Sequence, residues 1–79
     1  MSLLDMRDNP FLITEDIQQQ IYIITAKLGV PPTKVTEYLN LIQVNWLDKN
    51  NNSVMWRSNL DSVEIFDGEN VVVTYIDDL

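Results

Sequence analysis

The chain of 79 residues contains neither cysteine nor histidine, and it has only two glycines. Without cysteine it can form no disulfide and offers no thiolate to a metal ion or a substrate. Without histidine it lacks the side chain most often used as a general base and as a metal ligand. Gly29 and Gly68 are too few for a glycine-rich phosphate loop. We therefore expect no bound metal, no cofactor and no small-molecule substrate.

Long hydrophobic runs are also missing. No apolar stretch approaches the ~20 residues that a membrane-spanning helix needs. Asp5 comes before the first hydrophobic segment, whereas a signal peptide begins with a basic region. We therefore expect a cytoplasmic protein without a membrane segment. Hydrophobic residues make up 46% of the chain, which is enough to form one modest core. A single domain over residues 14–79 is predicted, preceded by an N-terminal arm over residues 1–13.

Basic residues are scarce and unevenly placed. The net charge is −7; residues 1–58 hold six acids and five bases, a net of −1, whereas residues 59–79 hold six acids and no base. An anionic segment of this kind repels phosphates and attracts basic protein surfaces. Two interpretations stay open, a solubilising face and a recognition surface.

The arm has no sustained periodicity and contains Pro10, so an irregular conformation is predicted. Its apolar side chains pack either on the protein's own core or in a groove of a neighbouring subunit, and we favour the neighbour. A homo-oligomer or a subunit of a complex is thus expected. The apolar residues of the arm are Leu3, Leu4, Met6, Phe11 and Leu12.

Two helices are predicted after the arm. Thr14 can cap the first, and Gly29 supplies the left-handed position that commonly ends a helix. Pro31 and Pro32 can begin a second, shorter helix. The apolar stripe of the first helix is Ile17, Ile21, Ile24 and Leu28. The buried side of the second is Val35, Tyr38, Leu39 and Ile42.

The period then changes from 3.6 to 2, which predicts two hairpins. In the first, residues 48–52 form the loop, Trp46 lies opposite Val54, and Val44 lies opposite Trp56. In the second, the segments SVEIF and NVVVTYI flank an Asp-Gly turn. The predicted fold class is α+β: an irregular N-terminal arm and a two-helix corner packed on a three- or four-stranded antiparallel sheet.

Residues 25–40, TAKLGVPPTKVTEYLN, have the spacing of a helix-turn-helix. A helix that reads DNA presents basic and amide side chains to it. The second helix would be nearly neutral here, because Lys34 and Glu37 cancel, so a helical corner is favoured over a DNA reader. In the alternative interpretation the nucleic-acid-binding residues are Lys27, Thr33, Lys34, Thr36 and Asn40.

Catalysis is not expected, because only carboxylates remain as candidate groups. Asp61, Glu64, Asp67 and Glu69 cluster around a turn, but their spacing does not fit a calcium-binding loop. Both tryptophans are predicted to lie in the core, although Trp56 at a sheet edge could anchor a partner. The run Val71-Val72-Val73 fills both faces of a strand, which is therefore either covered or awaits a partner.

The sequence thus favours a non-enzymatic protein–protein interaction module, either a small subunit of a larger assembly or a regulator that binds another protein. A basic protein surface is the partner that the charge suggests. Two alternatives are a helix-turn-helix DNA-binding regulator and an acidic inhibitor that mimics nucleic acid. The predicted partner-binding residues are Leu3, Leu4, Phe11, Trp56, Asp61, Glu64, Asp67 and Glu69.

Overall fold

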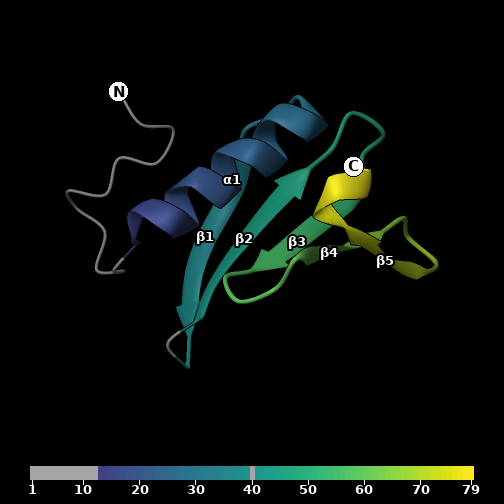
Figure 1. Ribbon diagram of the computed structural model, residues 1–79. Helices are drawn as coiled ribbons and strands as arrows, with labels where there is room; N and C mark the ends of the chain where they lie inside the picture. Colours follow the sequence, from purple (N-terminus) through teal and green to yellow (C-terminus); the bar gives the residue numbers. More distant parts are fainter. Residues whose placement is uncertain (1–12, 40) are drawn as a thin grey trace.

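One α-helix packs against one face of an antiparallel sheet in the computed structural model, which describes residues 13–39 and 41–79 (Figure 1). The predicted α+β class is confirmed in general terms. The predicted arm, apart from Ile13, lies outside the described residues. The elements are α1 (Glu15–Leu28), β1 (Pro32–Tyr38), β2 (Leu41–Leu47), β3 (Ser53–Arg57), β4 (Ser62–Phe66), β5 (Val71–Tyr75) and the 3-10 helix η1 (Ile76–Asp78).

Helix α1 begins and ends as its sequence predicts. The Thr14 hydroxyl accepts the Ile17 N–H at 3.3 Å, which satisfies one of the free donors of the first turn. Gly29 ends the helix in the left-handed conformation, with φ 74°, and its N–H donates to the Thr25 carbonyl at 2.8 Å. Ile21 and Ile24 are completely buried, so the apolar stripe faces the sheet as expected.

The predicted second helix is wrong, because residues 32–38 form strand β1 instead. Thr33, Val35 and Thr36 are β-branched and favour extended backbone. Pro32 also biases the residue before it toward extended backbone, and a proline is tolerated at the first position of an edge strand. Leu39, assigned to the buried side of that helix, lies in the β1–β2 turn with φ 51° and is 76% exposed. The helix-turn-helix geometry is therefore absent.

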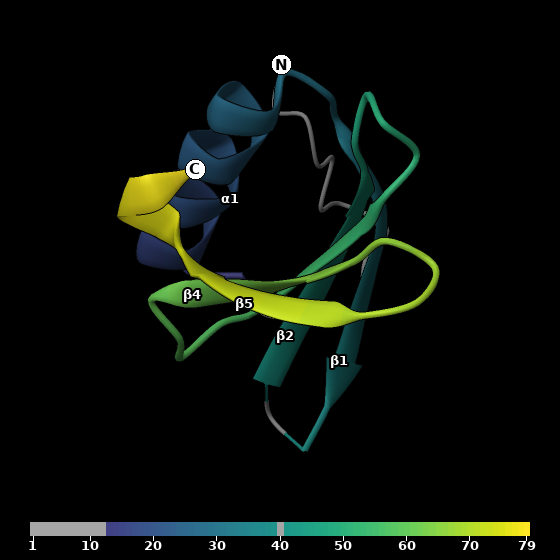
Figure 2. The same cartoon turned by 90° about the vertical axis from the view of Figure 1, so that its right-hand side faces the viewer.

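The sheet has five strands in the order β1-β2-β3-β4-β5, rather than three or four. Each strand pairs in antiparallel fashion with its neighbour in sequence, so β1 and β5 are the edges (Figure 2). Both predicted hairpins are confirmed. Trp46 pairs with Val54 and Val44 with Trp56 in the first, while β4 pairs with β5 in the second.

The core lies between α1 and one face of the sheet, and η1 returns to that same side (Figures 1 and 2). Both tryptophans are buried, as predicted. The Trp46 indole N–H donates to the Thr25 hydroxyl at 3.0 Å, and that of Trp56 donates to the Leu60 carbonyl at 2.8 Å. The buried core residues are Ile21, Ile24, Ile42, Val44, Trp46, Val54, Trp56, Val63 and Ile76. Strand β5 contributes none of them.

Candidate functional site

Strand β5 is an edge strand whose apolar side chains are exposed on both faces. Val72, on the helix-side face, is 54% exposed, and Val73, on the opposite face, is 65% exposed. Helix α1 covers residues of β2, β3 and β4 but leaves β5 outside the core. Within the described residues, the valine run is therefore left uncovered.

The β5 surface, as we name it, is the apolar patch that β5 forms with the end of β4 on the face of the sheet opposite α1. Register places its members side by side, because Phe66 pairs with Val71 and Tyr75 lies two residues beyond Val73 on the same face. A patch of adjoining exposed apolar side chains is typical of an interaction site rather than of a solvated face. The patch consists of Phe66, Val71, Val73 and Tyr75.

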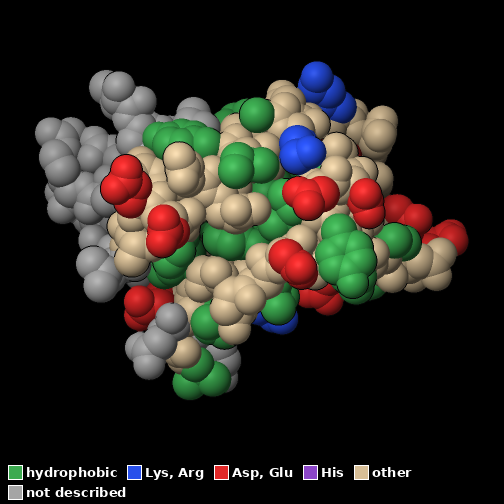
Figure 3. Space-filling model, in the orientation of Figure 1, with side chains coloured by type: hydrophobic (Ala, Val, Ile, Leu, Met, Phe, Trp, Pro, Cys, Tyr) green, Lys and Arg blue, Asp and Glu red, His purple; other side chains and the backbone are tan. Residues whose placement is uncertain are grey.

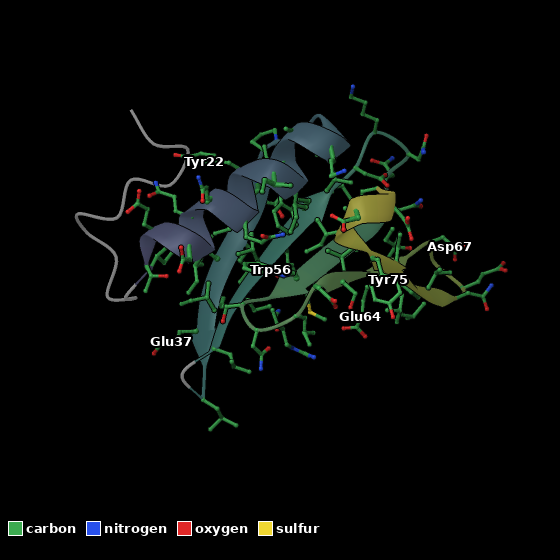
Figure 4. All side chains as sticks on the ribbon, in the orientation of Figure 1. Tyr22, Glu37, Trp56, Glu64, Asp67 and Tyr75 are labelled. Atoms are coloured by element: carbon green, nitrogen blue, oxygen red, sulfur yellow. The ribbon has the colours of Figure 1, made fainter. Side chains whose placement is uncertain are left out.

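Acidic side chains gather over the β4–β5 end of the molecule (Figure 3). Glu64, Asp67 and Tyr75 lie together at the β4–β5 end of the molecule, away from Glu37 on β1 (Figure 4). The predicted acidic residues are spread along this hairpin: Asp67 and Glu69 lie in the β4–β5 turn, Glu64 lies within β4, and Asp61 precedes β4. Helix η1 adds Asp77 and Asp78 after β5. We call these six residues, Asp61, Glu64, Asp67, Glu69, Asp77 and Asp78, the acidic border. Arg57 on β3 approaches Glu64 at 3.9 Å, a loose and exposed ion pair.

The turn between β4 and β5 is held by Asp67. Its carboxylate accepts the N–H of Asn70 at 2.9 Å and that of Glu69 at 3.0 Å. These two backbone hydrogen bonds, that from Asn70 foremost, lower the pKa of Asp67, because they favour the ionised form. Gly68 adopts φ 102°, a conformation that other residues rarely reach, as the sequence predicts. Asp67 is thus both a charge of the border and the residue that shapes the turn.

A separate hollow of about 380 Å³ lies between the start of α1 and the β3–β4 loop. Asp16 and Asp61 are its charged lining residues, and Ile17, Leu60 and part of Trp56 supply apolar walls. Ser58 also lines this hollow, and its hydroxyl accepts the Ile42 N–H at 3.1 Å. Among the described residues, no group of three or more Asp or Glu side chains is placed to hold a metal ion.

The remaining predicted site residues do not join the β5 surface. Trp56 is only 2% exposed and lies in the core, so it does not contribute to this exposed patch. Leu3, Leu4 and Phe11 lie outside the described residues.

The nucleic-acid candidates do not share one recognition helix. Lys27 lies in the last turn of α1, whereas Thr33, Lys34 and Thr36 lie on β1. Asn40 is outside the described residues. The Thr33 hydroxyl donates to the Asn45 carbonyl at 3.2 Å, which joins it to the neighbouring strand.

Sequence reasoning did not assign Phe66, Val71, Val73 or Tyr75 to the site, although the valine run was the signal that could have led to them. Within the described ranges, no helix has the length and hydrophobicity needed to cross a bilayer. Comparison of the chain with known protein families, with curated proteins and with solved structures found no match.

Proposed function

We propose that this protein is a non-enzymatic protein-binding module that engages its partner through the β5 surface and its acidic border. One observation carries the proposal: an edge strand with exposed valines on both faces has acidic residues at each of its ends. Covering four side chains that each retain about half of their surface is worth on the order of 3 to 6 kcal/mol before ordering costs. That gain suits association with another protein.

The acidic border supports a partner with basic character. Six carboxylates on and beside the β4–β5 hairpin raise the encounter rate with a positively charged protein and disfavour nucleic acid and acidic partners. An inhibitor that mimics nucleic acid would depend on the carboxylates and hardly on the valines. Neutralising acids and replacing apolar residues separately therefore distinguishes the two modes of binding.

Affinity capture from the native host tests the proposal when wild-type protein is compared with matched surface variants. The variant Val73→Lys places a charge in the middle of the β5 surface, and Ile23→Lys is its control, because Ile23 is an exposed apolar residue on α1. Proteins captured by wild type and by the Ile23 variant, but not by the Val73 variant, support the proposal. If both variants capture the same proteins as wild type, the β5 surface is not the binding site.

A further inference from the structure

We infer that β5 accepts an added β-strand from its partner, and that this strand carries an apolar centre flanked by lysine or arginine. The inference rests on the proposed function and specifies how the surface binds and what it recognises. It follows from which residues of β5 hydrogen-bond to β4, from the difference between the two sheet edges and from the position of the acidic residues.

The backbone of β5 directs alternate residues toward β4 and toward the open edge of the sheet. The Ile76 N–H donates to the Asp61 carbonyl at 2.9 Å, and the Asp67 N–H donates to the Asn70 carbonyl at 3.2 Å. In an antiparallel ladder, hydrogen-bonded and non-hydrogen-bonded pairs alternate. The even-numbered residues of β5 therefore face β4. Accordingly the N–H and C=O groups of Val71, Val73 and Tyr75 face the open edge, and no described strand pairs with them.

The two edges of the described sheet, β1 and β5, differ in how readily another strand could pair with them. Edge strand β1 carries Pro32 and Lys34, and its register shifts between these two residues. Proline, lysine and a bulge are the devices that keep an edge from pairing with another strand. Strand β5 has none of them: its sequence is VVVTY, and its register with β4 runs without a shift. One edge is blocked and the other is left able to pair.

The charges next to β5 favour a basic strand as its occupant. Acids flank β5 at both ends, with Asp67 and Glu69 before it and Asp77 and Asp78 after it. If two copies paired through β5 in antiparallel fashion about Val73, the acidic turn before β5 of one copy would approach the acidic η1 that follows β5 of the other. Like charges brought close to one another repel. A second copy is therefore a poor occupant, whereas a strand with a basic residue at each end of an apolar stretch complements both ends.

The same arrangement defines the length of the added strand. The exposed edge is the five residues of β5, so the apolar stretch of the ligand should be about as long, with its basic residues just outside. Main-chain hydrogen bonds to the open edge supply affinity, and the flanking charges supply selectivity. The ligand class is thus an extended basic-apolar-basic segment of a protein.

An NMR titration of the full chain tests this inference with a synthetic peptide, acetyl-KKVTVTVKK-amide. The amide protons of Val71, Val73 and Tyr75 should exchange rapidly in the free protein and become protected on binding. Those of Val72 and Thr74 should be protected in both states, because they already bond to β4. The control peptide acetyl-EEVTVTVEE-amide should bind about tenfold more weakly or not at all, since two or more charge pairs are lost.

Two protein variants separate strand addition from simple adhesion to an apolar patch. Val73→Pro removes an N–H that points to the open edge and leaves the pairing with β4 intact, so peptide binding should weaken about tenfold. Val73→Thr keeps that N–H and should bind within about threefold of wild type. Circular dichroism and the melting temperature establish that both variants are folded, and the exchange pattern of wild type tests the geometry without any variant.

Several outcomes would overturn the inference. Equal binding of the acidic peptide, or protection absent from the three edge amides, would exclude a basic added strand. Protection of those amides in the peptide-free protein together with a dimer in sedimentation would identify a second copy as the occupant. Partners that are lost on Val73→Lys but kept on Val73→Pro would leave the proposed function standing and reject strand addition alone.

Discussion

The hydrogen bond between Trp46 and Thr25 joins α1 to the sheet, and its removal should destabilise the domain measurably. The Trp46 indole N–H donates to the Thr25 hydroxyl at 3.0 Å, and the Trp46 side chain is 1% exposed. Thr25→Val keeps the shape and the helix propensity of residue 25 but removes the acceptor. The indole N–H is then left buried without a partner.

An unpaired donor of this kind costs about 1 to 3 kcal/mol, and the partial exposure of Thr25 places the expected loss at about 1 to 2 kcal/mol. In a domain of this size that corresponds to a fall in melting temperature of roughly 4 to 16 °C. Thermal unfolding followed by circular dichroism measures it. Thr25→Ser is the matched control: it retains the hydroxyl, loses one methyl group and should cost less than about 1 kcal/mol.

The exchange rate of the Trp46 indole proton gives a second, local measurement. It should rise in Thr25→Val, while that of the Trp56 indole proton should not, because Trp56 donates to the Leu60 carbonyl instead. If Thr25→Val melts with the wild type and the Trp46 proton exchanges as before, this hydrogen bond does not hold α1 to the sheet and the reasoning is refuted.

Three further predictions concern the β4–β5 turn and DNA. Gly68→Val and Gly68→Ala should each lower stability by roughly 1 kcal/mol or more in urea titrations, because φ is +102° and side chains disfavour that conformation. No neighbouring atom lies within 4 Å of an added β-carbon, so the cost comes from the backbone and not from a clash. An unchanged urea midpoint would show that this position carries no such strain. Asp67 should titrate below its ordinary pKa of 3.8 in a carboxyl NMR titration. Because the pKa of Asp67 is lower in the folded state, its ionised carboxylate stabilises the fold above the unfolded pKa, and this contribution is lost as the pH falls through the folded pKa. Asp67→Asn should remove the part of the pH dependence of stability that Asp67 contributes. A pKa of 3.8 or higher for Asp67 would contradict the prediction. Finally, duplex DNA should not bind appreciably near physiological salt, and submicromolar binding that weakens on Lys34→Ala would reverse that view.

The sequence predicted those parts of the fold in which secondary-structure propensity and the spacing of apolar residues indicated the same element. Thr14 and Gly29 bracket a stripe of period 3.6, and Asp67-Gly68 separates two β-rich runs, so α1 and the second hairpin could be predicted with their ends. The register of the first hairpin followed from keeping Trp46 and Val54 on one face. In each case neighbouring residues alone carried the information.

The second helix failed because its evidence was ambiguous. Apolar residues at 35, 38, 39 and 42 fit a helical period, but Thr33 and Val35 also alternate as in a strand. The decision came from β2, the next strand in the chain, which pairs with β1 from Tyr38–Leu41 onward. Whether two neighbouring segments pair cannot be decided from the pattern of one of them alone. Tertiary pairing thus overrode the local pattern.

The candidate site was predictable only in part for a related reason. The acids near Gly68 were evident, because charge can be counted along the chain. Whether Val73 would be covered depended on where α1 crosses the sheet, and that is a property of the packed structure. Trp56 illustrates the converse, since aromatic character suits both a core and an interface and only its burial distinguishes them.

Strand β5 is fastened unequally at its two ends, and this sets the order in which it can open. At one end Ile76 is 3% exposed and bonded through its N–H to the Asp61 carbonyl, which anchors the strand in the core. At the other end the turn around Gly68 is exposed and lies beyond the reach of α1. Local opening of the hairpin should therefore begin at the turn and proceed toward η1. A strand added to the open edge of β5 would hold β5 from the side opposite β4 and so oppose this opening.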